Sequence, residues 1–154
     1  MSRIHTEAER VIDAPPEEVY KFLSNYRESR PRILPSNFQD YAVEEGGRGE
    51  GTIISYRLQA GNRERSYRMR VEEPSRGRAL VERDLGSTLV NNWTVSPISG
   101  GQTLVAITTQ WESQASGVGS FFERTFAPMG LRRIYVDMLN RLADALGASA
   151  AASR

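Results

Sequence analysis

The middle of the chain is a series of short segments with alternating apolar residues, and the end is one long segment with helical spacing. Between residues 38 and 112 the segments are separated by turn signals such as Gly46-Gly47, Gly61-Asn62 and Gly100-Gly101. Strands joined by such short turns pair in an antiparallel sheet. The predicted strands are 38–45, 52–60, 63–73, 78–85, 88–96 and 102–112.

The long segment, residues 118–146, has apolar side chains at the spacings of one helix face and no turn pair. It predicts one amphipathic helix about 40 Å long, enough to cross a whole sheet, with a kink at Pro128-Met129-Gly130. The tail 147–154 is rich in Ala and Ser, and we expect it to fray. No linker or internal repeat interrupts the chain, so we expect residues 1–154 to form a single domain.

The first part of the chain adds one strand and two short helical pieces. Residues 4–13 alternate like a half-solvated strand, which Ala14-Pro15-Pro16 ends. Proline at a helix start followed by Glu17 and Glu18 favours a short helix. Residues 27–37 contain two prolines and predict a second short, broken helix or an ordered loop.

Composition excludes several kinds of chemistry. The 154 residues include no cysteine and one histidine, His5, near the start. A disulfide framework and a cysteine nucleophile are therefore excluded, and the composition argues against a zinc site and a Ser-His-Asp hydrolase. We expect no metal and no cofactor.

Charge gives no sign of a nucleic-acid or membrane partner. The formal net charge is +1, no apolar run approaches the ~20 residues of a membrane span, and the N-terminus does not resemble a signal peptide. Residues 57–83 carry eight arginines against four glutamates, but alternation spreads them over solvent-facing sides without interleaved aromatics. The glycine-rich turn, residues 46–51, lacks the Lys-Ser/Thr of a phosphate loop and leads into a strand. We expect a cytoplasmic protein without nucleic-acid binding or stable membrane insertion, either a monomer or a homodimer.

The order of these elements predicts an α+β fold, in which a curved seven-stranded antiparallel sheet wraps around the C-terminal helix and leaves a concave space between them. Over residues 3–146 the chain also resembles the helix-grip (SRPBCC) superfamily of START domains and Bet v 1-like pollen allergens, within it the bacterial polyketide cyclase/dehydrase branch. The residues that carry the resemblance are Ile12-Asp13-Ala14-Pro15 with Glu17 to Leu23, Gly49-Glu50-Gly51-Thr52, Leu80 to Asp84, Trp93-Thr94-Val95 with Gly100 to Thr103, and Leu131 to Ala143. It implies a helix-grip fold but no single activity, because branches of the superfamily bind lipids, polyketides or hormones, or catalyse cyclisation.

Apolarity assigns one face of each strand to the interior. The residues predicted to face inward are Ile54, Tyr56 and Leu58; Tyr67, Met69 and Val71; Leu80, Glu82 and Asp84; Leu89, Asn91, Trp93 and Val95; and Val105, Ile107, Thr109 and Trp111. Several of them are polar, and an unpaired buried polar atom costs ~1 to 3 kcal/mol. They therefore need partners, either within the protein or on a ligand.

Two interpretations of these polar residues stay open. In the functional one they orient a mostly apolar ligand, and a desolvated Glu82 with a raised pKa serves as general acid/base together with Tyr67. In the structural one Glu82 pairs with an arginine such as Arg68 or Arg83, and the tryptophans fill core volume. The candidate ligand-binding residues are Tyr56, Met69, Asp84, Asn91, Trp93, Thr109, Trp111, Phe122, Phe126, Met129 and Tyr135.

Three functions fit this prediction. The first is binding of a small hydrophobic, lipid-like or polyketide-like molecule, favoured because no nucleophile-base pair or cofactor motif is visible. The second is a cyclase, aromatase or dehydratase in which Glu82, Tyr56 or Tyr67 moves a proton. The third is a regulatory or toxin-like protein that binds a partner through its outer surface. A carboxylate without an arginine in a large cavity favours the enzyme, an apolar cavity favours the carrier, and a filled interior favours the partner protein.

Overall fold

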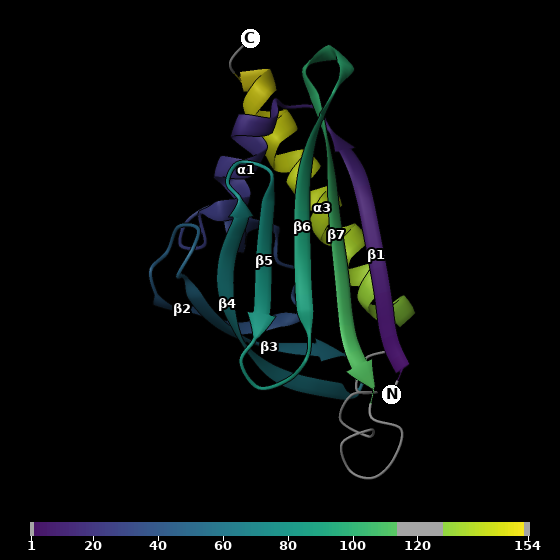
Figure 1. Cartoon of the computed structure of the whole chain (residues 1–154). Helices are drawn as coiled ribbons and strands as arrows, with labels where there is room; N and C mark the ends of the chain where they lie inside the picture. The colour runs from purple at the N-terminus through teal and green to yellow at the C-terminus, as the bar shows by residue number, and fades with distance from the viewer. Residues whose placement is uncertain (1, 114–127, 153–154) are drawn as a thin grey trace.

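The structure, a computed structural model, describes residues 2–113 and 128–152, which form one curved antiparallel sheet and a long helix (Figure 1). The seven strands lie in the order β1-β7-β6-β5-β4-β3-β2, so that all neighbours except β1 and β7 are consecutive in sequence. The elements are β1 (Ser2–Ile12), α1 (Pro16–Ser24), the 3-10 helix η1 (Arg30–Ile33), β2 (Phe38–Glu45), β3 (Ile53–Ala60), β4 (Arg63–Ser75), β5 (Ala79–Asp84), β6 (Val90–Ile98), the 3-10 turn η2 (Ser99–Gly101), β7 (Gln102–Ser113) and α3 (Pro128–Ala152).

Helix α3 crosses the concave face of the sheet and contacts β1 and η1 (Figure 1). Its buried face presents Leu131, Met138 and Leu142 among other apolar side chains, each at most 3% exposed. Opposite them lie the inner residues of the strands, and together they form one core. The predicted α+β helix-grip architecture is confirmed.

The predicted inner faces are also confirmed. Every strand residue assigned to the interior is buried, except Tyr56, which is partly buried. Burying a continuous apolar face fixes the register, because a slip of one residue would expose the whole set.

Several strand boundaries differ from the prediction by one or two residues, and two elements extend past a proline or a glycine. Strand β4 continues through Pro74 to Ser75. Proline has no amide hydrogen to donate to the neighbouring strand, and the register shift between Glu72 and Ser75 leaves it at a position where no such bond is required. Helix α3 continues through Gly147 to Ala152, beyond the predicted end at Leu146. The first part of the predicted helix, residues 118–127, lies outside the described residues.

The glycine-rich turn contains a glycine that no other residue can replace without moving a neighbour. Gly49 has a φ of +59°, and a Cβ atom there would overlap Oε1 of Glu73. That carboxylate is held by the Tyr20 hydroxyl at 2.5 Å and the Glu50 amide at 2.9 Å. Gly51, also at positive φ, has open space where a Cβ atom would lie and provides the matched control.

We therefore expect Gly49→Ala to destabilise the protein by more than Gly51→Ala. Both variants incur the backbone cost of a left-handed non-glycine residue, about 1–2 kcal/mol. Only Gly49→Ala also displaces the Glu73 carboxylate, which should add about 1–3 kcal/mol for the disturbed hydrogen bonds. Urea unfolding measures the free energy of unfolding of both variants. Equal losses would show that the Glu73 side chain moves aside without a measurable cost.

Candidate functional site

A buried ion pair lies at the centre of the molecule. Glu82 projects from β5 into the interior, and Nη2 of Arg30, in η1, lies 2.6 Å from its Oε2 atom. Both residues are 3% exposed. The Tyr26 hydroxyl donates a hydrogen bond of 2.5 Å to the same carboxylate oxygen.

The other Glu82 oxygen is occupied as well. Oε1 accepts hydrogen bonds from the Asn91 amide at 3.2 Å and from the Trp93 indole at 3.3 Å. We call Tyr26, Arg30, Glu82, Asn91 and Trp93 the Glu82 cluster. Because each oxygen has two donors, the carboxylate is paired and fully hydrogen-bonded rather than isolated.

Aromatic rings hold the arginine of the cluster in place. The Arg30 guanidinium lies 4.7 Å from the ring centre of Tyr26 and 4.5 Å from that of Trp93. Its Nη1 donates to the carbonyl of Leu23 at the end of α1, at 2.8 Å. These contacts compensate part of the cost of burying the charge, because a cation over a ring face is attracted to it.

A chain of hydrogen bonds joins the Glu82 cluster to helix α3. Oγ1 of Thr109 lies 2.7 Å from Oδ1 of Asn91 and 2.7 Å from the Tyr135 hydroxyl. Tyr135 is in α3, so the network runs from η1 through the sheet to the helix. It satisfies the inward polar groups Asn91 and Thr109, for which the sequence required partners.

A small cavity lies between this network and the apolar core. The described residues line a small, partly open space of about 30 Å³, which has room for one or a few water molecules. Its apolar side is formed by Leu34, Phe38, Ile54, Leu58, Ile107 and Met138, and its polar side by Arg30, Tyr41, Tyr56, Glu82, Asn91, Trp93 and Tyr135.

Tyr56 is the polar residue of the cavity that stands without a partner. Its ring lies between those of Phe38, 5.0 Å away, and Tyr67, 5.7 Å away. None of the described residues hydrogen-bonds its hydroxyl. Burial and the neighbouring Glu82 charge raise the pKa of Tyr56 well above its ordinary value. The hydroxyl is therefore neutral at physiological pH and available as a donor.

The structure places the predicted site residues in different surroundings. The structure brings Tyr56, Glu82, Asn91, Trp93 and Tyr135 together around the cavity, with Thr109 one hydrogen bond away. The buried residues Tyr67, Met69 and Trp111 face inward without lining it. Phe122 and Phe126 lie outside the described residues.

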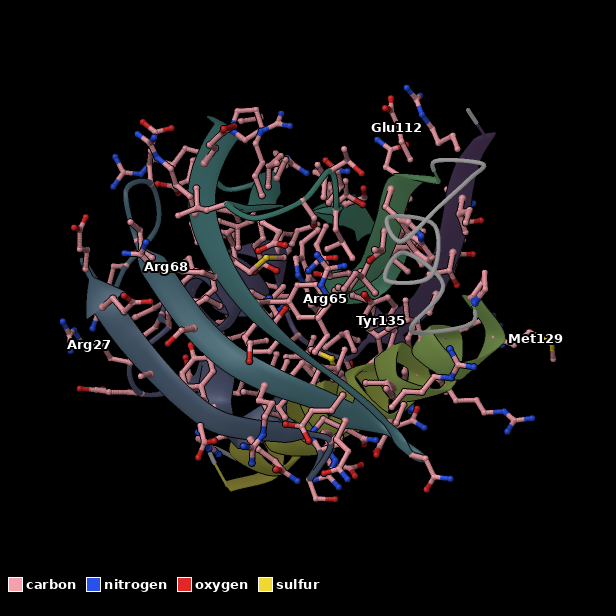
Figure 2. The ribbon with its side chains drawn as sticks, turned by 90° about the horizontal axis from the view of Figure 1, so that it is seen from below. Arg27, Arg65, Arg68, Glu112, Met129 and Tyr135 are labelled. Atoms are coloured by element: carbon pink, nitrogen blue, oxygen red, sulfur yellow. The ribbon has the colours of Figure 1, made fainter. Side chains whose placement is uncertain are left out.

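Two predicted ligand-binding residues have other surroundings. The Asp84 carboxylate accepts hydrogen bonds from the Ser87 hydroxyl at 2.6 Å and the Arg68 amide at 3.1 Å, and so shapes the β5–β6 turn. Met129 is 71% exposed and points away from the molecule in Figure 2, at the start of α3. Neither lines the interior cavity.

The sequence missed the cationic partner of Glu82. The proposed partners, Arg68 and Arg83, lie on the outer face of the sheet and pair with Glu44 and Glu72. Alternation already places both arginines opposite to the Glu82 side of their strands. Arg30 lies in an irregular, proline-containing segment where no periodicity indicates which side chains turn inward.

The described residues contain no group of three or more His, Asp or Glu side chains that could hold a metal ion. Within the same ranges, no helix has both the length and the apolar character needed to cross a membrane.

Comparison with known proteins agrees with this fold. The family model described as polyketide cyclase/dehydrase and lipid transport matches residues 3–147. The solution structure of KanY protein is 38% identical, covers 96% of this chain and 99% of its own, and superposes with a TM-score of 0.82. No curated protein matches the sequence.

More distant structures share the fold alone. The Zhui aromatase/cyclase from Streptomyces sp. R1128 is 14% identical, with a TM-score of 0.72 over 94% of this chain and 93% of that one. A norcoclaurine synthase point mutant from Thalictrum flavum, in complex with a transition-state analogue, is 15% identical, with a TM-score of 0.71 over 96% of both chains.

Proposed function

The chain belongs to the polyketide cyclase/dehydrase and lipid transport family, and on that premise we propose that its interior binds a small, mostly apolar molecule carrying a hydrogen-bond acceptor. The ligand lies between the inner face of the sheet and α3, with its acceptor toward the Tyr56 hydroxyl. Pockets of this type are mostly apolar, with a few polar groups that fix orientation.

One observation carries the proposal: Tyr56 lines the cavity, and its hydroxyl has no hydrogen-bond partner among the described residues. Tyr56 is only partly buried, so its hydroxyl is open to a partner from outside the protein, and a ligand acceptor can provide one. The Glu82 cluster and Tyr135 are already bonded to one another, so they provide a rigid polar wall.

A ligand larger than water needs more room than about 30 Å³. Met138 in α3 and Phe38 at the start of β2 line the cavity, and Phe38 is only partly buried. Methionine is unbranched and repacks easily. Movement of these two side chains enlarges the cavity without breaking the hydrogen-bond network.

The arrangement favours binding over proton transfer. Both oxygens of Glu82 are occupied by donors, one of them the Arg30 guanidinium. Burial raises the pKa of Tyr67 to about 12, so at neutral pH this tyrosine is a donor and not a base. A cyclase-like reaction would depend on positioning the ligand rather than on these groups.

The small size of the interior space supports a second candidate function, in which the protein binds a partner protein through its outer surface. The small volume favours this function over a carrier that is permanently open. Ligand titration separates the two, because the partner protein would keep its interior closed to every small molecule.

We expect wild-type protein to bind acetylnaphthalene, which has a carbonyl acceptor, about tenfold more tightly than ethylnaphthalene, which has none. Trp93 lines the cavity and is one of only two tryptophans, so its fluorescence reports occupancy. Tyr56→Phe should abolish the preference for the ketone. Tyr20→Phe removes a hydroxyl that bonds Glu73 outside the cavity and should leave the preference intact.

Two results would contradict the proposal. If neither naphthalene changes the fluorescence and the protein purifies without a bound small molecule in native mass spectrometry, the interior is closed and the partner function is favoured. If both bind equally, Tyr56 does not orient the ligand.

A further inference from the structure

A groove on the outside of the molecule is much larger than the interior cavity. It measures about 510 Å³ and lies where α1 meets the β4–β5 turn and the glycine-rich turn. Figure 1 shows that the β4–β5 turn lies beside α1. This volume is within the range of small-molecule sites.

Three arginines from two separate parts of the sequence line this groove. Arg48 belongs to the glycine-rich turn, and Arg76 and Arg78 to the β4–β5 turn. All three are exposed, and none forms an ion pair or a side-chain hydrogen bond with a described residue. In contrast, Arg68 and Arg83 on the outer face of the sheet are each paired with a carboxylate.

The backbone holds these arginines in fixed positions. Arg48 forms an isolated β-bridge with Asn25, and the next amide, of Gly49, donates to the carbonyl of Ser24 at 3.0 Å. The Arg78 amide donates to Ser75, and its carbonyl accepts from Val95. The backbones of Arg48 and Arg78 are therefore anchored, Arg76 lies in the turn that the bond from Arg78 to Ser75 closes, and the guanidinium groups are free to turn toward a ligand.

The acidic residues of the groove offset only part of the charge of the arginines. Glu73 accepts hydrogen bonds from the Tyr20 hydroxyl at 2.5 Å and the Glu50 amide at 2.9 Å, so its oxygens are already engaged. Partial burial acts to raise the pKa of Glu73, but these donors and the nearby Arg76 outweigh it and lower that pKa. With Glu17 the groove has two carboxylates against three arginines.

The amides of three glycines in the glycine-rich turn are not available to an anion. Those of Gly47, Gly49 and Gly51 donate to Thr52, Ser24 and Val71. The sequence-based prediction of an ordinary turn is in keeping with this, and recognition of a ligand in the groove falls to side chains.

We propose that this groove binds a soluble small molecule with two linked phosphate groups, through Arg48, Arg76 and Arg78. The planar fork of a guanidinium matches the oxygens of a phosphate, and charge-assisted bonds of this kind are among the strongest in proteins. The groove has room for two phosphates, and its arginines come from two separate turns, so two linked phosphate groups can contact both turns at once. The site is separate from the interior cavity and does not depend on the function proposed for it.

The test uses inorganic pyrophosphate and orthophosphate, titrated into the full chain by calorimetry at low salt. We expect pyrophosphate to bind more tightly than orthophosphate, and to bind more weakly as salt is added. The triple variant Arg48→Gln, Arg76→Gln, Arg78→Gln should lose roughly tenfold or more in affinity. The corresponding triple lysine variant, which keeps the charges but not the forks, should lose less.

The matched control removes the same charge elsewhere. Arg70, Arg132 and Arg133 are exposed and lie outside the groove, and their replacement by glutamine should leave pyrophosphate binding unchanged. Equal losses in the two glutamine triples, no binding by the wild type, or no preference over orthophosphate would each overturn the proposal. Sedimentation with vesicles of phosphatidylcholine and phosphatidic acid tests whether the phosphate groups belong to a soluble molecule or to a lipid headgroup. If the protein binds the vesicles and pyrophosphate does not displace it, the proposal of a soluble ligand is wrong.

Discussion

Replacing Glu82 with glutamine is expected to lower the free energy of unfolding by about 3–5 kcal/mol. Glutamine is nearly the same shape but leaves the Arg30 guanidinium without a counter-charge at a site where both residues are 3% exposed. It also replaces an oxygen that accepts bonds with an NH₂ group, facing other donors such as Tyr26 or Asn91. Urea unfolding followed by tryptophan fluorescence measures the loss.

The control for this prediction is an ion pair on the outer face. Glu72→Gln breaks the contact with Arg83, in which both side chains are at least 40% exposed, and should cost less than about 1 kcal/mol. Equal effects of Glu72→Gln and Glu82→Gln would mean that water reaches the interior pair.

Removing both partners gives a second check. Glu82→Leu combined with Arg30→Met should be more stable than either single variant, because no charge is left unpaired. Recovery should be incomplete, since the Tyr26 hydroxyl and the Trp93 indole lose their acceptor. The Glu82 cluster thus has a structural role that a double-variant cycle can measure.

Alternation in the sequence was enough to predict the interior of the sheet. Each strand has a solvated face and a buried one, and residues two apart lie on the same face. Asn91 is therefore predicted to face inward with Trp93, and Thr109 with Ile107. The same rule placed Tyr56 and Glu82 on the inner face, where they line the cavity. Half of the candidate site therefore follows from the period of two.

Tyr135 and Met138 follow from the helical spacing of α3, and the remaining lining residues come from segments without a clear period. Arg30 and Tyr26 lie in and before η1, where the chain follows a 3-10 turn, and Tyr41 lies in β2, whose pairing with β3 is interrupted by register shifts. Which of their side chains enter the core depends on packing against distant strands, so the ion pair between Arg30 and Glu82 could not be predicted locally. Cavity volume is likewise a small difference between large packed volumes and has no sequence pattern.

The second large effect is expected at high pH, because all six tyrosines of the chain have raised pKa values. Burial is the main cause in each case: the pKa of Tyr67 rises to about 12, and those of Tyr20, Tyr26, Tyr41, Tyr56 and Tyr135 rise further. In the unfolded chain a tyrosine titrates near about 10. Above that pH the unfolded state releases protons that the native state retains, so stability falls as pH rises toward the native pKa values.

The expected slope is steep. Each tyrosine contributes about 1.4 kcal/mol per pH unit in this window, so Tyr26, Tyr67 and Tyr135, each at most 5% exposed, together remove about 4 kcal/mol per unit. With a total stability of about 5–15 kcal/mol, the protein should unfold cooperatively within about one to four pH units above 10. Below pH 10 both states keep their protons, and these residues give no pH dependence.

Tyrosinate absorbance and tryptophan fluorescence, followed together as pH is raised, measure this effect. In the native protein both signals should change in one step, whereas protein unfolded in guanidinium should show simple titration near the ordinary pKa. Tyr67→Phe should shift the midpoint upward, because its hydroxyl bonds none of the Glu82 cluster and one ionising group is removed. Gradual ionisation near pH 10 without a change in fluorescence would mean that water reaches these hydroxyls.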